Sequence, residues 1–281
     1  MDLGLRSDER ILVLGSSGWF GQEFMALLPT DNTVLAVPGP TSGAHIEDQQ
    51  IVDFAPTIVA NFAFLTRERV DSDGVEAFLA INTQLTERFL RFAQLPGVRG
   101  LLTISSGAAI TEPDHPYGQL KLAEEQAALS LNSPRRTAVV ARAYSVSGPH
   151  VRRPEQYAFS DLIMQAMQGD MKIKAPVPVY RRYCSVADTL TVSMRSLDAG
   201  RSGVFETGGP LVEIGELAEA VRAEIAPHVS INRAWDPEST PQRYASDDTS
   251  WRDWTSAASV RPSDLNEQIA AAARGLGNPR T

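Results

Sequence analysis

Short apolar runs alternate with longer amphipathic stretches along the first half of the chain. The apolar runs that predict buried strands occupy residues 10–15, 33–37, 58–62, 100–105 and 137–142. The stretches whose apolar residues recur three or four positions apart, and which predict helices, occupy residues 18–28, 75–94 and 117–130. Strands that alternate with helices in this way predict an α/β fold with a doubly wound parallel sheet. Ligands of such sheets bind beyond the carboxyl ends of the strands.

The pattern changes after Pro149. Prolines separate shorter elements there, and helices are predicted near residues 157–168, 213–226 and 263–274, with short strands between them. We therefore predict two parts. Residues 1–149 form the core, and residues 150–281 form mainly a small mixed lobe, with some segments that return to the core.

A glycine-rich turn follows the first predicted strand. Gly15, Gly18 and Gly21 lie three residues apart, and the residues beyond them have a helical pattern. Such a turn places free N–H groups and the positive end of a helix at one point, which favours a diphosphate. A side chain at Gly15 or Gly18 would block the diphosphate, and one at Gly21 would keep the helix away from the strand. The turn predicts a dinucleotide site in residues 1–149, although glycines here can also serve the turn alone.

A serine, a tyrosine and a lysine follow in the order that carbonyl chemistry uses. Ser106 ends the apolar run at 100–105, and Tyr117 and Lys121 are four residues apart, so they share one face of a helix. A lysine ammonium beside a phenol lowers the pKa of the phenol, which makes tyrosine a usable acid or base near neutral pH. We predict Ser106, Tyr117 and Lys121 as catalytic residues, with Ser106 bonded to the substrate oxygen.

On these motifs the chain resembles the extended short-chain dehydrogenase/reductase family, in its NAD(P)-dependent epimerase/dehydratase branch that acts on nucleotide sugars. The family's glycine motif matches Gly15, Gly18 and Gly21, its serine matches Ser106, and its YxxxK motif matches Tyr117 and Lys121. The resemblance implies a Rossmann-like fold, an NAD(P)-dependent oxidoreductase and a C-terminal lobe that binds the substrate. It also implies a homodimer formed through the helices at 75–94 and 117–130.

Weaker similarities continue along the chain, at Asn82, at residues 141–149, at residues 182–188 and at residues 207–210. The resemblance implies that the cofactor contacts Gly15, Ser17, Gly18, Trp19, Phe20, Gly21, Thr41, Ser42, Phe62, Ala63, Asn82, Lys121 and Tyr144. It implies that the substrate contacts Ser106, Ser145, Arg182 and Arg243. The arginines that could form a diphosphate clamp are Arg152, Arg153, Arg181, Arg182 and Arg243. We select Arg182 and Arg243 because their segments resemble the family.

The second predicted strand lacks the acidic residue that usually binds the ribose hydroxyls of NAD. That position reads Leu-Ala-Val-Pro-Gly-Pro-Thr-Ser over residues 35–42. A carboxylate would repel a 2′-phosphate, so its absence favours NADP(H), with Thr41 and Ser42 as candidate donors. No arginine stands nearby in the sequence, and NAD(H) stays an alternative.

The reaction class stays open among four alternatives. We favour NAD(P)(H)-dependent reduction of a keto group on a nucleotide-linked sugar, because the missing ribose carboxylate suits a cofactor that is exchanged at each turnover. A nucleotide-sugar 4-epimerase with tightly bound NAD is the first alternative. The short interval from Ser106 to Tyr117 leaves a reductase of small carbonyl compounds open, and a non-catalytic dinucleotide-binding protein is the last alternative. Dehydration is disfavoured because no acidic pair follows Ser106.

Composition and charge restrict the partners. A formal net charge of −8 at pH 7 argues against nucleic-acid binding, which needs a basic surface. One cysteine, Cys184, excludes an internal disulfide and a cysteine-rich metal site, and we predict no metal. No apolar run approaches the length of a membrane span, and the first residues do not resemble a signal peptide. We therefore expect a cytoplasmic protein without a membrane partner.

Overall fold

The computed structural model describes residues 3–43, 46–236 and 238–277. Its centre is a parallel sheet of six strands in the order β2-β1-β3-β4-β5-β9. The strands are β1 (Arg10–Leu14), β2 (Thr33–Val37), β3 (Ile58–Asn61), β4 (Gly100–Ser106), β5 (Thr137–Ala143) and β9 (Gly203–Glu206). Every residue of β3 and β4 is buried, because helices cover both faces of the sheet. The predicted doubly wound α/β fold is confirmed.

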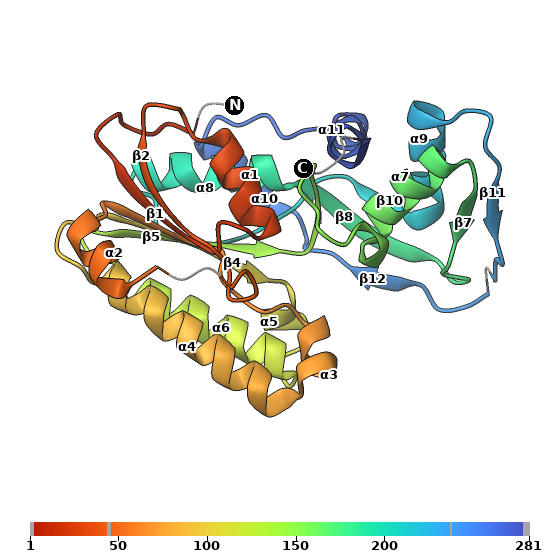
Figure 1. The fold of residues 1–281 in the computed structure, drawn as a ribbon. Helices are drawn as coiled ribbons and strands as arrows, with labels where there is room; N and C mark the ends of the chain where they lie inside the picture. Colours follow the sequence, from red (N-terminus) through yellow and green to blue (C-terminus); the bar gives the residue numbers. More distant parts are fainter. Residues whose placement is uncertain (1–2, 44–45, 237, 278–281) are drawn as a thin grey trace.

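Two layers of helices enclose this sheet (Figure 1). One face carries α1 (Trp19–Leu27), α8 (Val186–Asp198) and α10 (Thr249–Ala257). The other face carries α2 (Asp48–Phe54), α4 (Val75–Ala93) and α6 (Pro116–Ser130), with the short helices α3 (Glu68–Asp73) and α5 (Ala108–Thr111) near the carboxyl end of β4. The glycine turn, Ser106 and the N-terminus of α6 therefore lie on the same edge of the sheet.

The lobe forms beside that edge around strand β8 (Val179–Ser185). β8 pairs with β10 (Leu211–Glu213), β12 (Gln242–Tyr244) and β6 (Ser145–Ser147). A second small sheet consists of β7 (Met171–Ile173) and β11 (Ile231–Arg233). The helical elements are η1 (Pro154–Gln156), α7 (Ala158–Gln168), α9 (Ile214–Ile225) and α11 (Leu265–Gly277). Some segments after Pro149 return to the core: β9 joins the central sheet, and α8 and α10 pack on it.

The helix α8 is absent from the sequence-based prediction, although it packs on the central sheet. Its buried face contains Thr189, Thr191 and Ser193 among apolar residues, which hides the helical spacing. The hydroxyls of these residues are satisfied inside the helix; Ser193 Oγ, for example, donates to the Thr189 carbonyl at 2.7 Å. Local bonds of this kind let a polar-looking segment enter the core.

Two further results concern partners. Within residues 3–43, 46–236 and 238–277, no helix is both long and apolar enough to cross a membrane. Within the same ranges, no three or more His, Cys, Asp and Glu side chains gather in a way that could hold a metal ion.

Candidate active site

A cavity of about 500 Å³ opens at the carboxyl ends of β1, β3, β4 and β5. Of the residues predicted from the sequence, those that line it are Gly15, Ser17, Gly18, Trp19, Phe20, Thr41, Phe62, Ala63, Ser106, Tyr117, Lys121 and Tyr144. The predicted residues outside its lining are Gly21, Ser42, Asn82, Ser145, Arg182 and Arg243. The tertiary structure thus brings the glycine turn and the catalytic candidates to one cavity.

The three glycines of the turn do different work. Gly15 has φ +79°, and a Cβ atom there would lie 2.5 Å from the Ala63 nitrogen. A Cβ atom on Gly21 would lie 2.2 Å from the Gly15 carbonyl oxygen, so Gly21 allows α1 to approach the turn. A Cβ atom on Gly18 would meet only the Gly15 oxygen, at 3.3 Å. Gly18 is the N-cap of α1 and faces the cavity, so the turn fits the diphosphate of a dinucleotide.

An arginine reaches this turn from far along the chain. Arg152 Nη1 donates to the Ser17 carbonyl at 3.3 Å, and Ser17 Oγ accepts the Gly39 N–H at 2.9 Å. Gly39 and Thr41 follow β2 and line the cavity together with Arg152. The sequence analysis noted no arginine near this position, because Arg152 is 135 residues away from Ser17 in sequence.

Tyr117 enters the cavity from the first turn of α6. His115 caps this helix by accepting the Tyr117 N–H, and Pro116 occupies the first helical position. The Tyr117 ring packs between Phe64 and Phe78, with centroids 5.9 and 6.5 Å away. Burial raises the pKa of Tyr117 well above its ordinary value, and a hydrogen bond with Ser106 lowers it by less.

Ser106 lies at the end of β4 and has partners besides Tyr117. Its Oγ accepts the Ala108 N–H at 3.2 Å and lies 3.4 Å from the hydroxyl of Tyr244. Tyr244 belongs to β12 of the lobe, and its ring packs at 5.1 Å from Tyr144. The sequence analysis missed Tyr244, because only the pairing of β12 with β8 brings it here.

The surroundings of Lys121 differ from the expectation that it acidifies Tyr117. Its Nζ donates to the Ile104 carbonyl at 2.8 Å and to Glu124 Oε2 at 3.1 Å, and it lies 3.5 Å from the centroid of the Phe64 ring. Burial lowers the pKa of Lys121, and the Glu124 carboxylate opposes this shift. The pKa of Tyr117 is raised, contrary to the expected lowering.

Other predicted contact residues support the walls of the cavity. Asn82 is fully buried, and its Oδ1 accepts the Leu65 N–H at 2.7 Å, which holds a loop that lines the cavity. Ser42 donates its N–H to the Gly39 carbonyl at 3.1 Å. Ser145 begins β6 and pairs in register with Tyr183 of the lobe. Asn82, Ser42 and Ser145 all lie outside the cavity lining, but Asn82 and Ser42 each bond a residue of that lining.

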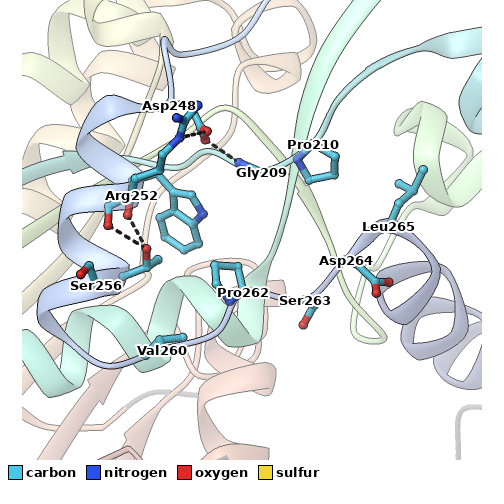
Figure 2. Close-up of a pocket in the computed structure, with 12 residues that line it drawn as sticks. Gly209, Pro210, Asp248, Arg252, Ser256, Val260, Pro262, Ser263, Asp264 and Leu265 are labelled. Atoms are coloured by element: carbon cyan, nitrogen blue, oxygen red, sulfur yellow. Dashed lines mark hydrogen bonds and ion pairs between the residues drawn. The ribbon is translucent and has the colours of Figure 1, made fainter.

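Arg182 is bound to other residues of the protein. Its guanidinium donates to the carbonyl of Gly209 at 2.8 Å and of Ser246 at 3.1 Å, and lies 3.8 Å from Asp248. Figure 2 shows Asp248 bonded to Gly209 and Arg252 beside a separate hollow of about 520 Å³ next to α10. This hollow shares no lining residue with the dinucleotide cavity. Arg182, one of the two arginines selected from the sequence, therefore binds segments of the lobe to each other and does not line the cavity.

Arg181, the preceding residue of β8, also lies outside the cavity lining, but on the other side of the strand from Arg182. Successive residues of β8 face opposite sides, and Tyr244 pairs with Arg181 in the register of β12 with β8. The Arg181 guanidinium lies 5.7 Å from the centroid of the Tyr244 ring, on the side of Ser106. Arg243 pairs with Tyr180, is exposed and lies on the opposite face from Arg181.

The sequence profile of the NAD dependent epimerase/dehydratase family matches residues 11–208, which include the glycine turn, Ser106, Tyr117 and Lys121. The chain belongs to this family. The resemblance inferred from the motifs is thereby confirmed. No curated protein matches the chain by sequence.

Solved structures with a similar fold include a protein in complex with NADPH, a 4-epimerase and a dehydratase. RMD from Pseudomonas aeruginosa, complexed with NADPH, has a TM-score of 0.73 at 21% identity and covers 95% of this chain and 98% of its own. The UDP-N-acetylglucosamine 4-epimerase from Methanobrevibacter ruminantium has a TM-score of 0.79 at 16% identity, covering 96% and 98%. The NDP-hexosamine 5,6-dehydratase TunA has a TM-score of 0.75 at 16% identity, covering 97% and 99%. At these identities the similarity establishes the fold alone, so the reaction has to be inferred from the residues of the site.

Proposed function

We propose that this protein is an NADP(H)-dependent oxidoreductase that reduces a keto group of a nucleotide-linked sugar. The observation that carries the proposal is Arg152, whose guanidinium lies at the glycine turn, next to Gly39 at the end of β2. A guanidinium binds phosphate oxygens with two parallel hydrogen bonds, whereas an acidic residue at this place would repel a 2′-phosphate. Thr41 lines the same part of the cavity and offers a hydroxyl.

The cavity residues divide the reaction between them. The glycine turn and Arg152 would hold a reduced nicotinamide dinucleotide, which would supply the hydride for the carbonyl carbon of the substrate. Tyr117 donates its proton to the carbonyl oxygen as the electron pair of the C=O bond moves onto that oxygen. Ser106 donates a hydrogen bond to the same oxygen and so stabilises the developing negative charge. A phenol, whose ordinary pKa is near 10, carries its proton at neutral pH, so Tyr117 has a proton to donate.

The substrate side of the proposal rests on the lobe. Tyr244 lies beside Ser106, and the Arg181 guanidinium lies 5.7 Å from the centroid of its ring, so a diphosphate held by Arg181 would leave the sugar near Ser106. We therefore replace Arg182 by Arg181 as the candidate ligand of the nucleotide diphosphate. A homodimer through α4 and α6, which lie side by side on one face of the sheet (Figure 1), completes the proposal and is testable by light scattering.

The test is a titration of nucleotide-free protein with NADPH and NADH, followed by the fluorescence of the reduced nicotinamide. We expect NADPH to bind at least tenfold more tightly, a difference of about 1.4 kcal/mol. Arg152→Ala should remove most of this preference. Arg135→Ala is the matched control, because Arg135 is an exposed arginine at the amino end of β5, on the opposite edge of the sheet.

The other outcomes separate the alternatives. Tighter binding of NADH, or NAD that resists stripping, would contradict the reductase proposal and favour a 4-epimerase. Binding of neither dinucleotide would refute an oxidoreductase. If NADPH binds and nucleotide sugars fail to protect the protein against thermal unfolding while small ketones consume NADPH, the substrate class is wrong and the cofactor assignment stands.

A further inference from the structure

The Ser106 hydroxyl lies between the hydroxyls of two tyrosines. On the cavity side it shares a hydrogen bond with Tyr117. On the lobe side its Oγ lies 3.4 Å from the hydroxyl of Tyr244, which does not line the cavity. Its third neighbour is the Ala108 N–H, which it accepts at 3.2 Å. Because Ser106 is only 9% exposed, these groups and the substrate oxygen compete for one buried hydroxyl.

Tyr244 is held in place by groups other than Ser106. Its strand β12 pairs with β8, with Tyr244 opposite Arg181. Its ring packs 5.1 Å from the Tyr144 ring, and the Arg181 guanidinium lies 5.7 Å from its centroid. The lobe therefore fixes this phenol, which reaches the site from behind the cavity lining, through Ser106.

The hydrogen-bonding capacity of Ser106 limits what the two phenols can do. A serine hydroxyl has one proton to donate and two lone pairs that accept. The Ala108 N–H can only donate, so it occupies one lone pair. One lone pair and one proton remain, and only one of Tyr117 and Tyr244 can donate to that lone pair. The phenol that does so decides in which direction the Ser106 proton points.

We propose that Tyr244 is a positioning residue, whose hydroxyl donates to Ser106 and so directs the Ser106 proton into the cavity. Ser106 then donates to the Tyr117 oxygen before the substrate binds, and to the substrate oxygen afterwards. Because Tyr117 accepts in this arrangement, its own proton stays available for the substrate. Without the Tyr244 hydroxyl, Tyr117 would donate to Ser106, and its proton would point away from the substrate. The inference rests on the proposed function, in which Ser106 and Tyr117 both donate to the substrate oxygen.

The surroundings of the Tyr244 hydroxyl support its role as donor. Within residues 3–43, 46–236 and 238–277, Ser106 is the one side chain within hydrogen-bonding distance of this hydroxyl, so no other side chain competes for its proton. The separation of 3.4 Å is long for two hydroxyls, which usually lie about 2.5–3.0 Å apart. Hydrogen bonds of catalytic sites are often long before the substrate binds and shorten in its complex.

The test is carbon-13 NMR of protein labelled at the Cζ atom of tyrosine, whose chemical shift responds to the hydrogen bonds of the phenol. The chain has six tyrosines, and each signal is assigned by the phenylalanine variant that removes it. In Ser106→Ala, we expect the signals of Tyr244 and Tyr117 to move. In Tyr244→Phe, we expect the Tyr117 signal to move as well, because Tyr117 changes from acceptor to donor. This measurement needs neither cofactor nor substrate.

Tyr183→Phe is the matched control. Tyr183 is a tyrosine of β8 that is 4% exposed, packs against Phe159 and does not line the cavity. Its loss should leave the signals of Tyr117 and Tyr244 in place. If it moves the Tyr117 signal as far as Tyr244→Phe does, repacking of the lobe is the cause and the proposal is wrong.

Two further outcomes of the NMR experiment would overturn the proposal. A Tyr244 signal that is unchanged in Ser106→Ala would show that the two hydroxyls are not bonded. A Tyr117 signal that is unchanged in Tyr244→Phe would show that Ser106 does not pass the effect of Tyr244 into the cavity.

Turnover gives a second readout, with NADPH and the keto compound, nucleotide-linked or small, that the wild type reduces fastest. We expect Tyr244→Phe to lower kcat about five- to tenfold, as for the loss of one hydrogen bond. KM should change little, because a phenylalanine ring keeps the contact with Arg181.

A double-mutant cycle shows whether Tyr244 acts through Ser106. In a Ser106→Ala background, Tyr244→Phe should lower kcat no further, because both substitutions remove the same interaction. An equal effect of Tyr244→Phe in the two backgrounds would overturn the proposal. Failure of NADPH to bind would instead refute the proposed function, and the NMR result would still decide the role of Tyr244.

Discussion

The two sides of the cavity are built in different ways. On the side of the central sheet, Gly15 and Ser106 lie at the ends of long parallel strands that are buried on both faces. On the side of the lobe, behind the lining, Tyr244 reaches Ser106 from β12, a strand of three residues, which pairs with β8 and its Arg181 in one register. The first set is positioned by local chain geometry, and the second by contacts between segments far apart in sequence.

This difference explains why two neighbouring residues of β8, Arg181 and Arg182, have different partners. A shift of one position along β8 exchanges the side that faces Tyr244 with the side that faces Asp248 and Gly209. Along the glycine turn, the steric demands at Gly15 and Gly21 allow one backbone path. The side-chain positions in the lobe therefore depend on strand register, whereas those of the turn depend on local steric contacts.

The largest expected effect tests the rigid side. Gly15→Ala forces an alanine into φ +79° and places its Cβ 2.5 Å from a backbone nitrogen, so we expect a loss of about 3–5 kcal/mol in the free energy of unfolding. Urea denaturation measures this loss. Gly18→Ala is the control, because its Cβ meets only one atom, at 3.3 Å. It should keep the stability within about 1 kcal/mol and weaken NADPH binding. Equal stabilities of the two variants would contradict the comparison.

The next effect separates the two arginines of β8. Arg182→Ala leaves Asp248 and the carbonyls of Gly209 and Ser246 without this donor, and we expect a loss of roughly 2–3 kcal/mol in the free energy of unfolding. Arg181→Ala should change the stability by less than about 1 kcal/mol and weaken the binding of UDP, measured by calorimetry. If Arg182→Ala weakens UDP binding more than Arg181→Ala does, the assignment of the two faces is wrong.

The smallest effect concerns Glu23 of α1, at the point where the core is followed by the lobe. Glu23 lies near Gly148 and 3.9 Å from His150. Burial raises the pKa of Glu23 from 4.5 to about 7. The folded protein therefore holds a proton that the unfolded chain releases between these values, and stability falls as pH rises through that window. Glu23→Gln should be more stable than the wild type above pH 7, by roughly 2 kcal/mol.

Thermal unfolding between pH 4 and 8 measures this difference, which should disappear near pH 4. Glu87→Gln, on the exposed side of α4, is the control and should show no difference at any pH. A stabilisation of Glu23→Gln that is the same at pH 4 and pH 8 would rule out titration of Glu23 as its cause.

The sequence by itself determined the core of this protein. Periodicity located the five predicted strands to within one residue at either end, because strands buried on both faces must be continuously apolar. The order of glycine turn, Ser106, Tyr117 and Lys121 then placed all of these at one edge, since parallel strands share their carboxyl edge. These inferences need only local chemistry and one topological rule.

Tertiary structure decided the rest. The tertiary structure alone brings Arg152 to the glycine turn, Tyr244 to Ser106, and Arg182 to the Gly209 and Ser246 carbonyls. The spacing of Tyr117 and Lys121 predicted that they share a helix face, but Asn61 and Thr103 decide, through Glu124, where the lysine charge is directed. Contacts between residues that are distant in sequence leave no periodic pattern, because each depends on the packing of whole elements rather than on its neighbours in the chain.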